Sequence, residues 1–327
     1  MPRRVFLGEP YVRAIVFDNG LALRRDYPEP KRTAGESIVK VLTAGICGTD
    51  LELTRGYMAW RGVLGHEFVG RVVESENRDL LGCRVVGSIN AACRRCRFCA
   101  QGLGRHCPNR TVLGILGRDG AFADLLALPD ENLHPVPEAV PDELAVFTEP
   151  VAAAYEILEQ KAIPRNHRIL VLGDGRLGAI VAMVMAAEDY DVVVAGHYRG
   201  KLAALSALGL TARPESELTG GYDVVVDCTG TSAGLSRALE MVRPRGTVVL
   251  KSTAADGANL NLAPAVVNEV TMLGSRCGRM GPALDALAAG RVDPRPLVSD
   301  VFPLDDGRAA FEAAGKAPNF KILLKIS

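Results

Sequence analysis

The sequence predicts an α/β protein of two domains, an irregular and mostly β domain followed by a doubly wound parallel sheet with helices on both faces. Three observations support this prediction. The chain has 327 residues, which corresponds to about two domains at ~150 residues each. Short β-type runs separated by glycine and proline fill the sequence up to about residue 145. From about residue 151, apolar strands alternate with alanine-rich helical stretches.

The first part is predicted to contain short strands, because its apolar runs are rich in valine and isoleucine and end at turn-forming residues. Because this part is also rich in glycine and proline, we expect an irregular and mostly β domain. The predicted strands cover residues 13–17, 37–42, 68–73 and 83–86.

The second part is predicted to form a parallel sheet. Its strands are apolar throughout, which is typical of strands that helices cover on both faces. The predicted strands cover residues 168–172, 191–195, 222–227 and 246–250, and the predicted helices cover residues 178–187, 201–208 and 232–242. This alternation is typical of a nucleotide-binding domain.

Composition and charge exclude several classes of protein. Hydrophobic residues make up 48% and charged residues 23% of the chain, which excludes disorder, collagen and coiled coil. Lysine plus arginine number 38, as do aspartate plus glutamate, so the chain has no net charge. Its overall charge therefore does not favour nucleic acid or anionic lipid as a partner. The longest apolar stretch, residues 180–187, is far shorter than the ~20 residues of a membrane span. In residues 1–9 a glutamate precedes any signal-like apolar run, so we expect a cytoplasmic protein. We also expect a small-molecule substrate and no nucleic-acid or membrane partner.

A glycine-rich loop follows the first strand of the second part and opens a helix. It reads Gly173-Asp174-Gly175-Arg176-Leu177-Gly178, which is the G-x-G-x-x-G fingerprint in its required context. Glycines permit the tight turn and the close approach of a pyrophosphate, whose charge the helix N-terminus stabilises. The alternative is a tight turn without a ligand. We expect a dinucleotide site that includes the backbone of Arg176 and Leu177.

The end of the next strand decides between NAD and NADP. An NAD site usually places an acidic residue there to bind the ribose 2′-hydroxyl. This chain has Gly196 at that position, with His197, Arg199 and Lys201 nearby. A missing carboxylate and three basic side chains favour a 2′-phosphate, so the sequence predicts NADP over NAD. Under the alternative interpretation, Arg199 and Lys201 are only the solvated start of a helix.

Four cysteines lie within 15 residues, at Cys93, Cys96, Cys99 and Cys107. Four thiolates at this spacing can enclose a tetrahedral Zn²⁺ and leave no position open for a substrate, which is typical of a structural zinc site. A redox thiol pair and an iron–sulfur cluster are weaker alternatives.

Two further motifs complete a pattern. Cys47 lies in Gly-Ile-Cys-Gly-Thr-Asp, residues 45–50, and His66 begins His-Glu-Phe-Val-Gly, residues 66–70. With the cysteine cluster and the glycine loop, these four motifs resemble, in order, the zinc-dependent medium-chain dehydrogenase/reductase family, which includes alcohol, sorbitol and threonine dehydrogenases. The resemblance covers nearly the whole chain. It implies a GroES-like catalytic domain of residues 1–147 and 290–327, and a Rossmann domain of residues 148–289.

The resemblance also implies the ligands of a catalytic zinc ion. Cys47 and His66 match two of them by position. Glu67 matches a carboxylate that binds zinc in some members and only approaches it in others, and Glu149 matches the third protein ligand. Which of the two glutamates binds at rest stays open.

Two neighbours of Cys47 match supporting positions in the family. Asp50 matches the acceptor that orients the imidazole of the zinc-bound histidine. Thr49 matches the hydroxyl that passes a proton between the substrate oxygen and the cofactor ribose. At Glu52, where alcohol dehydrogenases of this family often have a histidine that carries the proton to solvent, this chain departs from the pattern.

The resemblance implies an oxidoreductase that transfers a hydride between NAD(P)(H) and an alcohol or carbonyl compound, assembled as a homodimer or homotetramer. Glu52 and the short segment of residues 54–61 keep a second reaction open, the reduction of an activated C=C bond in an enoyl thioester or enone. A third possibility is a zinc- and nucleotide-binding protein without turnover.

Overall fold

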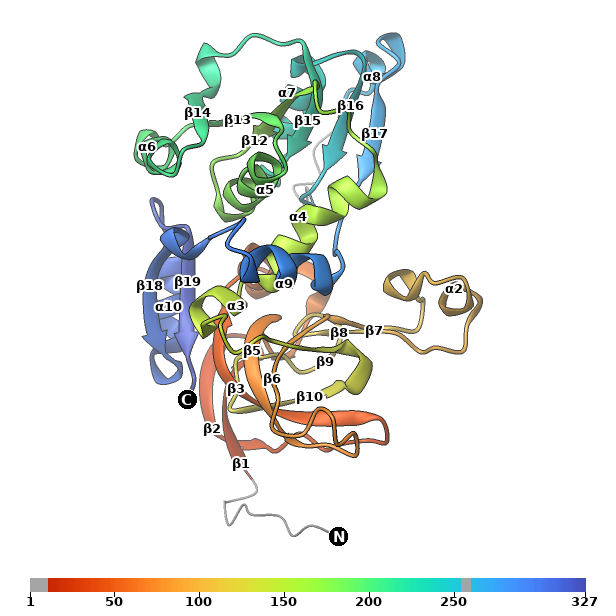
Figure 1. Ribbon diagram of the computed structural model, residues 1–327. Coiled ribbons are helices and arrows are strands. Elements are labelled where there is room, and N and C mark those ends of the chain that lie inside the picture. The colour runs from red at the N-terminus through yellow and green to blue at the C-terminus, as the bar shows by residue number, and fades with distance from the viewer. Residues whose placement is uncertain (1–10, 254–259) are drawn as a thin grey trace. The chain divides into compact units, whose positions relative to one another are not determined.

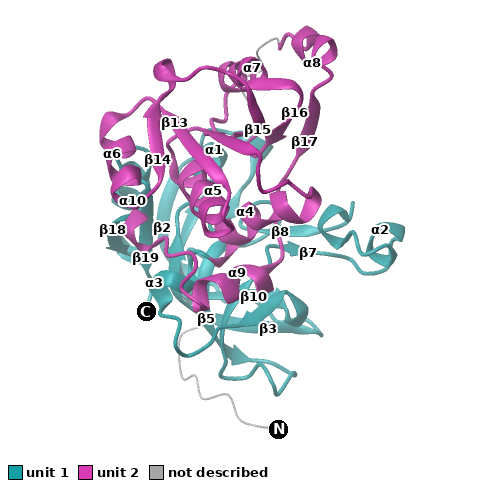
Figure 2. Ribbon diagram, turned by 45° about the horizontal axis from the view of Figure 1, so that its top comes forward, with its two compact units in different colours: residues 1–147, 298–327 teal, residues 148–297 magenta. Residues whose placement is uncertain are grey.

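The computed structural model describes residues 11–253 and 260–327, and the amino-terminal segment considered as a signal sequence lies outside this range. The chain divides into two compact units (Figure 2). Unit 1 comprises residues 1–147 and 298–327, and unit 2 comprises residues 148–297. The compact units divide the chain at residues 147/148 and 297/298. The predicted domains, divided at residues 147/148 and 289/290, stay a prediction.

Unit 1 contains a seven-stranded sheet in the order β11-β6-β5-β3-β19-β18, with β10 paired to β3 (Figure 1). Strand β19, from the end of the chain, lies antiparallel to β3, so two distant segments share one sheet. The strands are β3 (Glu36–Gly45), β5 (Glu67–Glu74), β6 (Arg84–Gly87), β10 (Leu125–Pro129), β11 (Leu133–Pro135), β18 (Val298–Pro303) and β19 (Lys321–Lys325).

Among its described residues, unit 1 also contains two small sheets and four short α-helices. One sheet has the order β2-β1-β4 and the other β7-β8-β9. The strands are β1 (Tyr11–Phe17), β2 (Leu21–Pro28), β4 (Gly62–Val63), β7 (Asn90–Ala91), β8 (Thr111–Leu113) and β9 (Gly117–Arg118). The helices are α1 (Gly48–Thr54), α2 (Arg97–Ala100), α3 (Asp142–Ala145) and α10 (Gly307–Ala314).

Unit 2 is a six-stranded parallel sheet in the order β14-β13-β12-β15-β16-β17. This is the 3-2-1-4-5-6 order of two mononucleotide-binding halves. The strands are β12 (Arg168–Leu172), β13 (Asp191–Gly196), β14 (Thr211–Pro214), β15 (Tyr222–Asp227), β16 (Val242–Leu250) and β17 (Thr271–Gly274). The helices are α4 (Thr148–Gln160), α5 (Arg176–Ala187), α6 (Arg199–Ala207), α7 (Ser232–Met241), α8 (Ala263–Val267) and α9 (Met280–Ala288).

The α/β class with a doubly wound sheet is confirmed, and the predicted element bounds are close to those observed. Helix α5 begins two residues before the predicted start, because the helix opens directly after Gly175. Residue 242, predicted as the end of a helix, instead begins β16.

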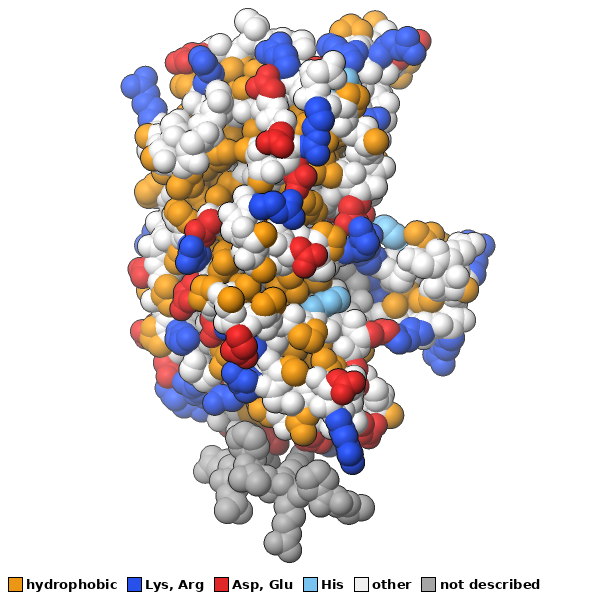
Figure 3. All heavy atoms as spheres, in the orientation of Figure 1, with side chains coloured by type: hydrophobic (Ala, Val, Ile, Leu, Met, Phe, Trp, Pro, Cys, Tyr) orange, Lys and Arg blue, Asp and Glu red, His pale blue; other side chains and the backbone are white. Residues whose placement is uncertain are grey.

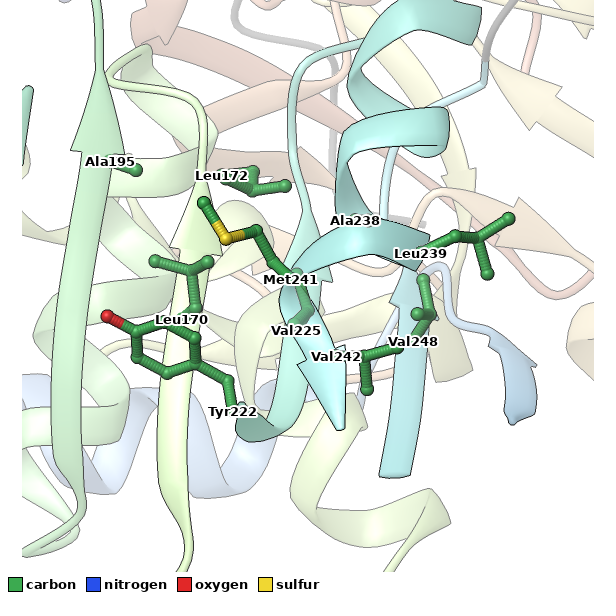
Figure 4. Packing of buried hydrophobic residues seen from close by; sticks show 10 residues of the cluster. All are labelled: Leu170, Leu172, Ala195, Tyr222, Val225, Ala238, Leu239, Met241, Val242 and Val248. Atoms are coloured by element: carbon green, nitrogen blue, oxygen red, sulfur yellow. The ribbon is translucent and has the colours of Figure 1, made fainter. Parts of the chain in front are cut away.

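One side of the parallel sheet is packed against α7 (Figure 4). Leu170, Leu172 and Val225 from the central strands belong to one buried cluster with the helix residues Leu239 and Met241, and all are at most 3% exposed. At ~25 cal/mol per Å² of apolar surface, burial of each large side chain contributes about 1.5–3 kcal/mol. Packing of this kind fixes the strand ends that carry the nucleotide loop.

No helix among residues 11–253 and 260–327 is long and apolar enough to cross a membrane. On the face shown in Figure 3, basic and acidic side chains are interspersed. This distribution agrees with the balanced charge of the sequence.

Candidate active site

The candidate metal ligands of unit 1 come from the facing ends of two paired strands. The register of the sheet pairs Gly45, the last residue of β3, with Glu67, the first residue of β5. Cys47 follows β3 at the start of α1, and His66 directly precedes β5. One ligand atom from each of Cys47, His66 and Glu67 lies within 4.8 Å of the other two. The sheet register therefore brings together residues that are about 20 positions apart in sequence.

Asp50 connects the two sides of this group. Its Oδ2 accepts a hydrogen bond of 2.8 Å from the backbone N–H of Cys47, and its Oδ1 accepts one of 3.3 Å from the N–H of Gly65. Oδ1 also lies 3.2 Å from Nδ1 of His66, although not at a hydrogen-bonding angle. Burial lowers the pKa of His66, but the Asp50 carboxylate and the sulfur of Cys47 together outweigh it and hold the pKa well above its usual range. Asp50 therefore lies beside one ring nitrogen of His66, which leaves the other available for a ligand.

Glu67 has a second partner that the sequence did not reveal. Its Oε2 forms a short ion pair with Nζ of Lys321, and both side chains are at most 2% exposed. The ammonium also donates to the carbonyl of Ile46 at 3.3 Å and lies 5.8 Å from the centre of the Phe147 ring. Lys321 is the first residue of the apolar strand β19 and would be predicted at a solvated strand end. Only the pairing of β19 with β3 places it beside Glu67.

The donor set of this group fits a zinc ion. Sulfur, imidazole nitrogen and carboxylate oxygen are the ligands that Zn²⁺ takes in proteins, and three protein ligands with one open position are typical of catalytic sites. Thr49 is close, with its Oγ1 3.9 Å from Sγ of Cys47. Glu52, on the same helix, is half-exposed and pairs with Arg55 at 2.6 Å. The structure therefore places Thr49 near the ligands and Glu52 at the surface.

The four-cysteine cluster forms a separate lobe of unit 1. Cys96 precedes α2 and Cys99 lies within it, so the helical spacing of three puts both thiols on one side. The Sγ of Cys96 lies 3.5 Å from that of Cys99 and 3.7 Å from that of Cys107. A tetrahedron with Zn–S bonds of 2.3 Å has edges of about 3.8 Å. The backbone at Arg95 and the nearby thiols lower the pKa of Cys93 to about 6, whereas desolvation and the neighbouring thiols raise the pKa of Cys99 to about 11. The sulfur positions, and not these pKa values, fit a tetrathiolate zinc site.

The glycine loop of unit 2 has the geometry of a phosphate-binding turn. Gly173 has φ +110°, and a Cβ on Gly178 would lie 1.9 Å from the carbonyl oxygen of Gly173. A Cβ on Gly175 would have open space around it. Gly175 precedes α5, whose first turn includes Arg176 and Leu177. The N-terminus of α5 can therefore receive a pyrophosphate.

The predicted basic residues lie near a small cavity of about 200 Å³ at the ends of β13 and β14. His197 and Arg199 line it, but Glu215 also does, and its carboxylate lies 3.3 Å from Nε2 of His197. Lys201 is only 9% exposed, and its Nζ lies 5.3 Å from the centre of the Tyr198 ring. Burial lowers the pKa of Lys201. The basic residues are thus balanced by acidic neighbours, and Lys201 is not a solvated helix start.

Glu149 lies in the first turn of α4, in unit 2. Its carboxylate is one of the groups whose charge acts on Lys251, a buried lysine at the carboxyl end of β16. Nζ of Lys251 donates to Oγ of Ser275 at 3.2 Å and to the carbonyl of Arg276 at 2.6 Å. Sequence reasoning missed Lys251, since a lysine that follows a strand gives no sign of burial.

Comparisons with known proteins cover both units. Residues 33–138 match the family model of the alcohol dehydrogenase GroES-like domain, and residues 177–289 match that of the zinc-binding dehydrogenase domain. The chain is 29% identical to L-threonine 3-dehydrogenase from Streptomyces coelicolor, over 96% of this chain and 99% of that protein. It is 27% identical to sorbitol dehydrogenase from Halalkalibacterium halodurans, over 92% and 94%. A putative zinc-binding dehydrogenase from Sinorhizobium meliloti, solved with NADP bound, is 25% identical, with a TM-score of 0.89 over 97% of this chain and 100% of that one.

Proposed function

Because the chain belongs to the zinc-dependent medium-chain dehydrogenase/reductase family, as an NAD(P)-dependent oxidoreductase, we propose that it interconverts an alcohol and a carbonyl compound at the Cys47 site. The single observation that carries this proposal is the convergence of Cys47, His66 and Glu67 within 4.8 Å. Zinc at these ligands would polarise the substrate oxygen, and the dinucleotide would give or take the hydride.

The chain's own residues have distinct roles in this proposal. Cys47, His66 and Glu67 hold the metal, and Glu149 stays the alternative prediction for the third protein ligand. Asp50 keeps the imidazole oriented by its contact at Nδ1. The hydroxyl of Thr49 lies 3.9 Å from Sγ of Cys47, where it can exchange a proton with a substrate oxygen. Glu52 faces solvent beside Arg55, so it can act as an acceptor for that proton at the surface.

The substrate class follows from chemistry shared by two relatives. Their names, sorbitol dehydrogenase and L-threonine 3-dehydrogenase, indicate a polyol and a hydroxy amino acid as substrates of those proteins. We therefore propose a small hydroxylated substrate. Reduction of an enone or enoyl thioester is the competing reaction, and product analysis separates the two.

The choice between NAD and NADP is a separate question from the reaction and its substrate. The prediction of NADP rests on Gly196 and the basic residues His197, Arg199 and Lys201. A relative solved with NADP supports it. The contact of His197 with Glu215 and the burial of Lys201 weigh against it. The sequence pattern therefore predicts NADP, whereas these two observations favour NAD, and the ratio of kcat/KM for NADPH and NADH decides between the two cofactors.

The proposal is tested with two cysteine variants. Cys47→Ser should lose about one zinc per chain and all turnover while the fold is kept, because Cys47 belongs to the catalytic ligand group. Cys96→Ser should also lose about one zinc but mainly lower the melting temperature, because its lobe has no open position. Zinc content, melting temperature and activity on a panel of polyols, hydroxy amino acids and enones are measured for both. Full activity in Cys47→Ser would contradict the proposal.

A further inference from the structure

We infer that Asp174, in the glycine loop, supplies the carboxylate that binds the adenosine ribose and selects NAD over NADP. The inference rests on the proposed function only in assuming that unit 2 binds a dinucleotide. Asp174 is thus the residue that determines cofactor specificity, and it lies outside the strand end where an NAD site usually has its acidic residue.

The first observation is the position of the Asp174 carboxylate. Asp174 follows β12, but its side chain reaches across to the end of β13. Its Oδ2 accepts hydrogen bonds from the backbone N–H groups of His197, at 2.9 Å, and Tyr198, at 2.8 Å. The residue is only 7% exposed. Two N–H donors at the tip of β13, which could otherwise bind a phosphate, are therefore already occupied.

The second observation concerns the residue that the pattern expects to be acidic. A Cβ built on Gly196 would lie 2.2 Å from Oδ2 of Asp174 and 2.4 Å from its Cγ. The carboxylate of Asp174 thus occupies the space of a side chain at residue 196. The acidic group expected in an NAD site is therefore present, but Asp174, which follows the neighbouring strand β12, supplies it. Glycine is required at residue 196 because any larger side chain would overlap this carboxylate.

The third observation is the charge around this carboxylate. Lys201 is buried nearby, and the charge of Asp174 acts to raise its pKa against the lowering effect of burial. Glu215 and Glu217 line the adjacent cavity together with His197 and Arg199. A 2′-phosphate would place a charge of about −2 next to a carboxylate whose nearby hydrogen-bond donors are already occupied. A 2′-hydroxyl can instead donate a hydrogen bond to it.

The test uses ligands that report on the adenosine half alone. ADP-ribose and 2′-phospho-ADP-ribose are titrated calorimetrically into the zinc-loaded full chain. We expect wild type to bind ADP-ribose more tightly. Asp174→Ala should weaken the binding of ADP-ribose by about 10- to 100-fold, which is the range for one hydrogen bond to a charged group. The same variant should not weaken the binding of 2′-phospho-ADP-ribose. Asp191→Ala, at the opposite and exposed end of β13, is the matched control and should bind both ligands as wild type does.

A rescue variant separates ribose binding from loop ordering. In Asp174→Ala the Cβ of residue 174 would still lie 2.3 Å from a Cβ on residue 196, so the rescue starts from Asp174→Gly. Adding Gly196→Asp to Asp174→Gly should restore ADP-ribose affinity to within about threefold of wild type. Gly196→Asp alone should fail, because two carboxylates would compete for one space. Melting temperatures are measured alongside to show that the variants fold.

Three outcomes overturn the inference: wild type prefers the 2′-phosphorylated ligand, Asp174→Ala weakens both ligands equally, or wild type binds neither. Failure of the proposed function looks different. If ADP-ribose binds as expected but no alcohol or carbonyl compound is turned over, Asp174 keeps its role and the proposed reaction is wrong. If alcohols are oxidised with NADP in preference to NAD, the reaction stands and the role of Asp174 is wrong.

Discussion

The ion pair between Lys321 and Glu67 makes the sharpest stability prediction for unit 1. We consider Lys321→Met, which keeps the length and apolar stem of the side chain and removes the ammonium. Both partners are at most 2% exposed, so water cannot replace the lost charge. Glu67 would then be a buried carboxylate without its counter-charge.

The size of the effect follows from this burial. Removal of one partner of a buried pair costs about 3–5 kcal/mol, because the remaining charge is left uncompensated. For a domain of this size, each 1 kcal/mol lowers the melting temperature by about 2–4 °C. The expected fall is therefore about 6–20 °C. Lys325→Met, at the exposed end of the same strand β19, should cost less than about 0.5 kcal/mol.

The measurement can be restricted to unit 1. The chain has one tryptophan, Trp60, and it lies in this unit, so its emission during urea unfolding follows unit 1. The comparison is made after treatment with a chelator, since bound Zn²⁺ offers Glu67 another positive partner and reduces the loss. The double variant with Glu67→Gln should recover at least about 2 kcal/mol, because the uncompensated charge is gone.

Two results would refute this reasoning. The first is a loss in Lys321→Met no larger than that in Lys325→Met. The second is a double variant as unstable as Lys321→Met. Either result would mean that the ammonium does not hold the charge of Glu67.

Unit 2 supports two further predictions. Burial lowers the pKa of Lys251 to about 8, against about 10.4 in an unfolded chain, so between these pH values the unfolded chain binds more protons and the unfolding free energy rises with pH. Relative to Lys251→Met, wild type should gain about 3 kcal/mol from pH 7.5 to pH 10.5 in denaturant titrations, and parallel curves would contradict the assignment. Gly178→Ala should lower the melting temperature and abolish NADH binding in calorimetry, because its Cβ would lie 1.9 Å from the carbonyl oxygen of Gly173. Gly175→Ala should keep the melting temperature, as open space surrounds its Cβ; a similar fall in both variants would argue against a steric cause.

The parallel sheet of unit 2 was predictable because its strands are apolar over their whole length. Strands β12 and β15 have the predicted bounds of residues 168–172 and 222–227. Such strands need helices on both faces, and the chain supplies helices between them. The short strands of unit 1 were harder to predict, since a two-residue strand such as β4 (Gly62–Val63) forms through its partner and not through its own sequence.

The candidate site was predictable where ligand type and local spacing carry the information. The four cysteines are held close by short turns and by α2, so their proximity follows from their spacing. Lys321, Lys251 and the reach of Asp174 were not predictable, because each depends on which distant strand lies alongside. The charge argument for NADP counted side chains near residue 196 in sequence and so missed a carboxylate that arrives there from β12.

Unit 1 is interrupted by unit 2 along the chain, so a ribosome synthesises Glu67 254 residues before Lys321. Unit 2 has all its strands while β18 and β19 are still missing from the first sheet. We therefore expect the nascent amino-terminal segment to expose the edge of β3 and an unneutralised glutamate until the last strands dock. During that interval the segment is a natural client for a chaperone, and mutations that slow the docking of β19 would reduce yield before they reduce activity.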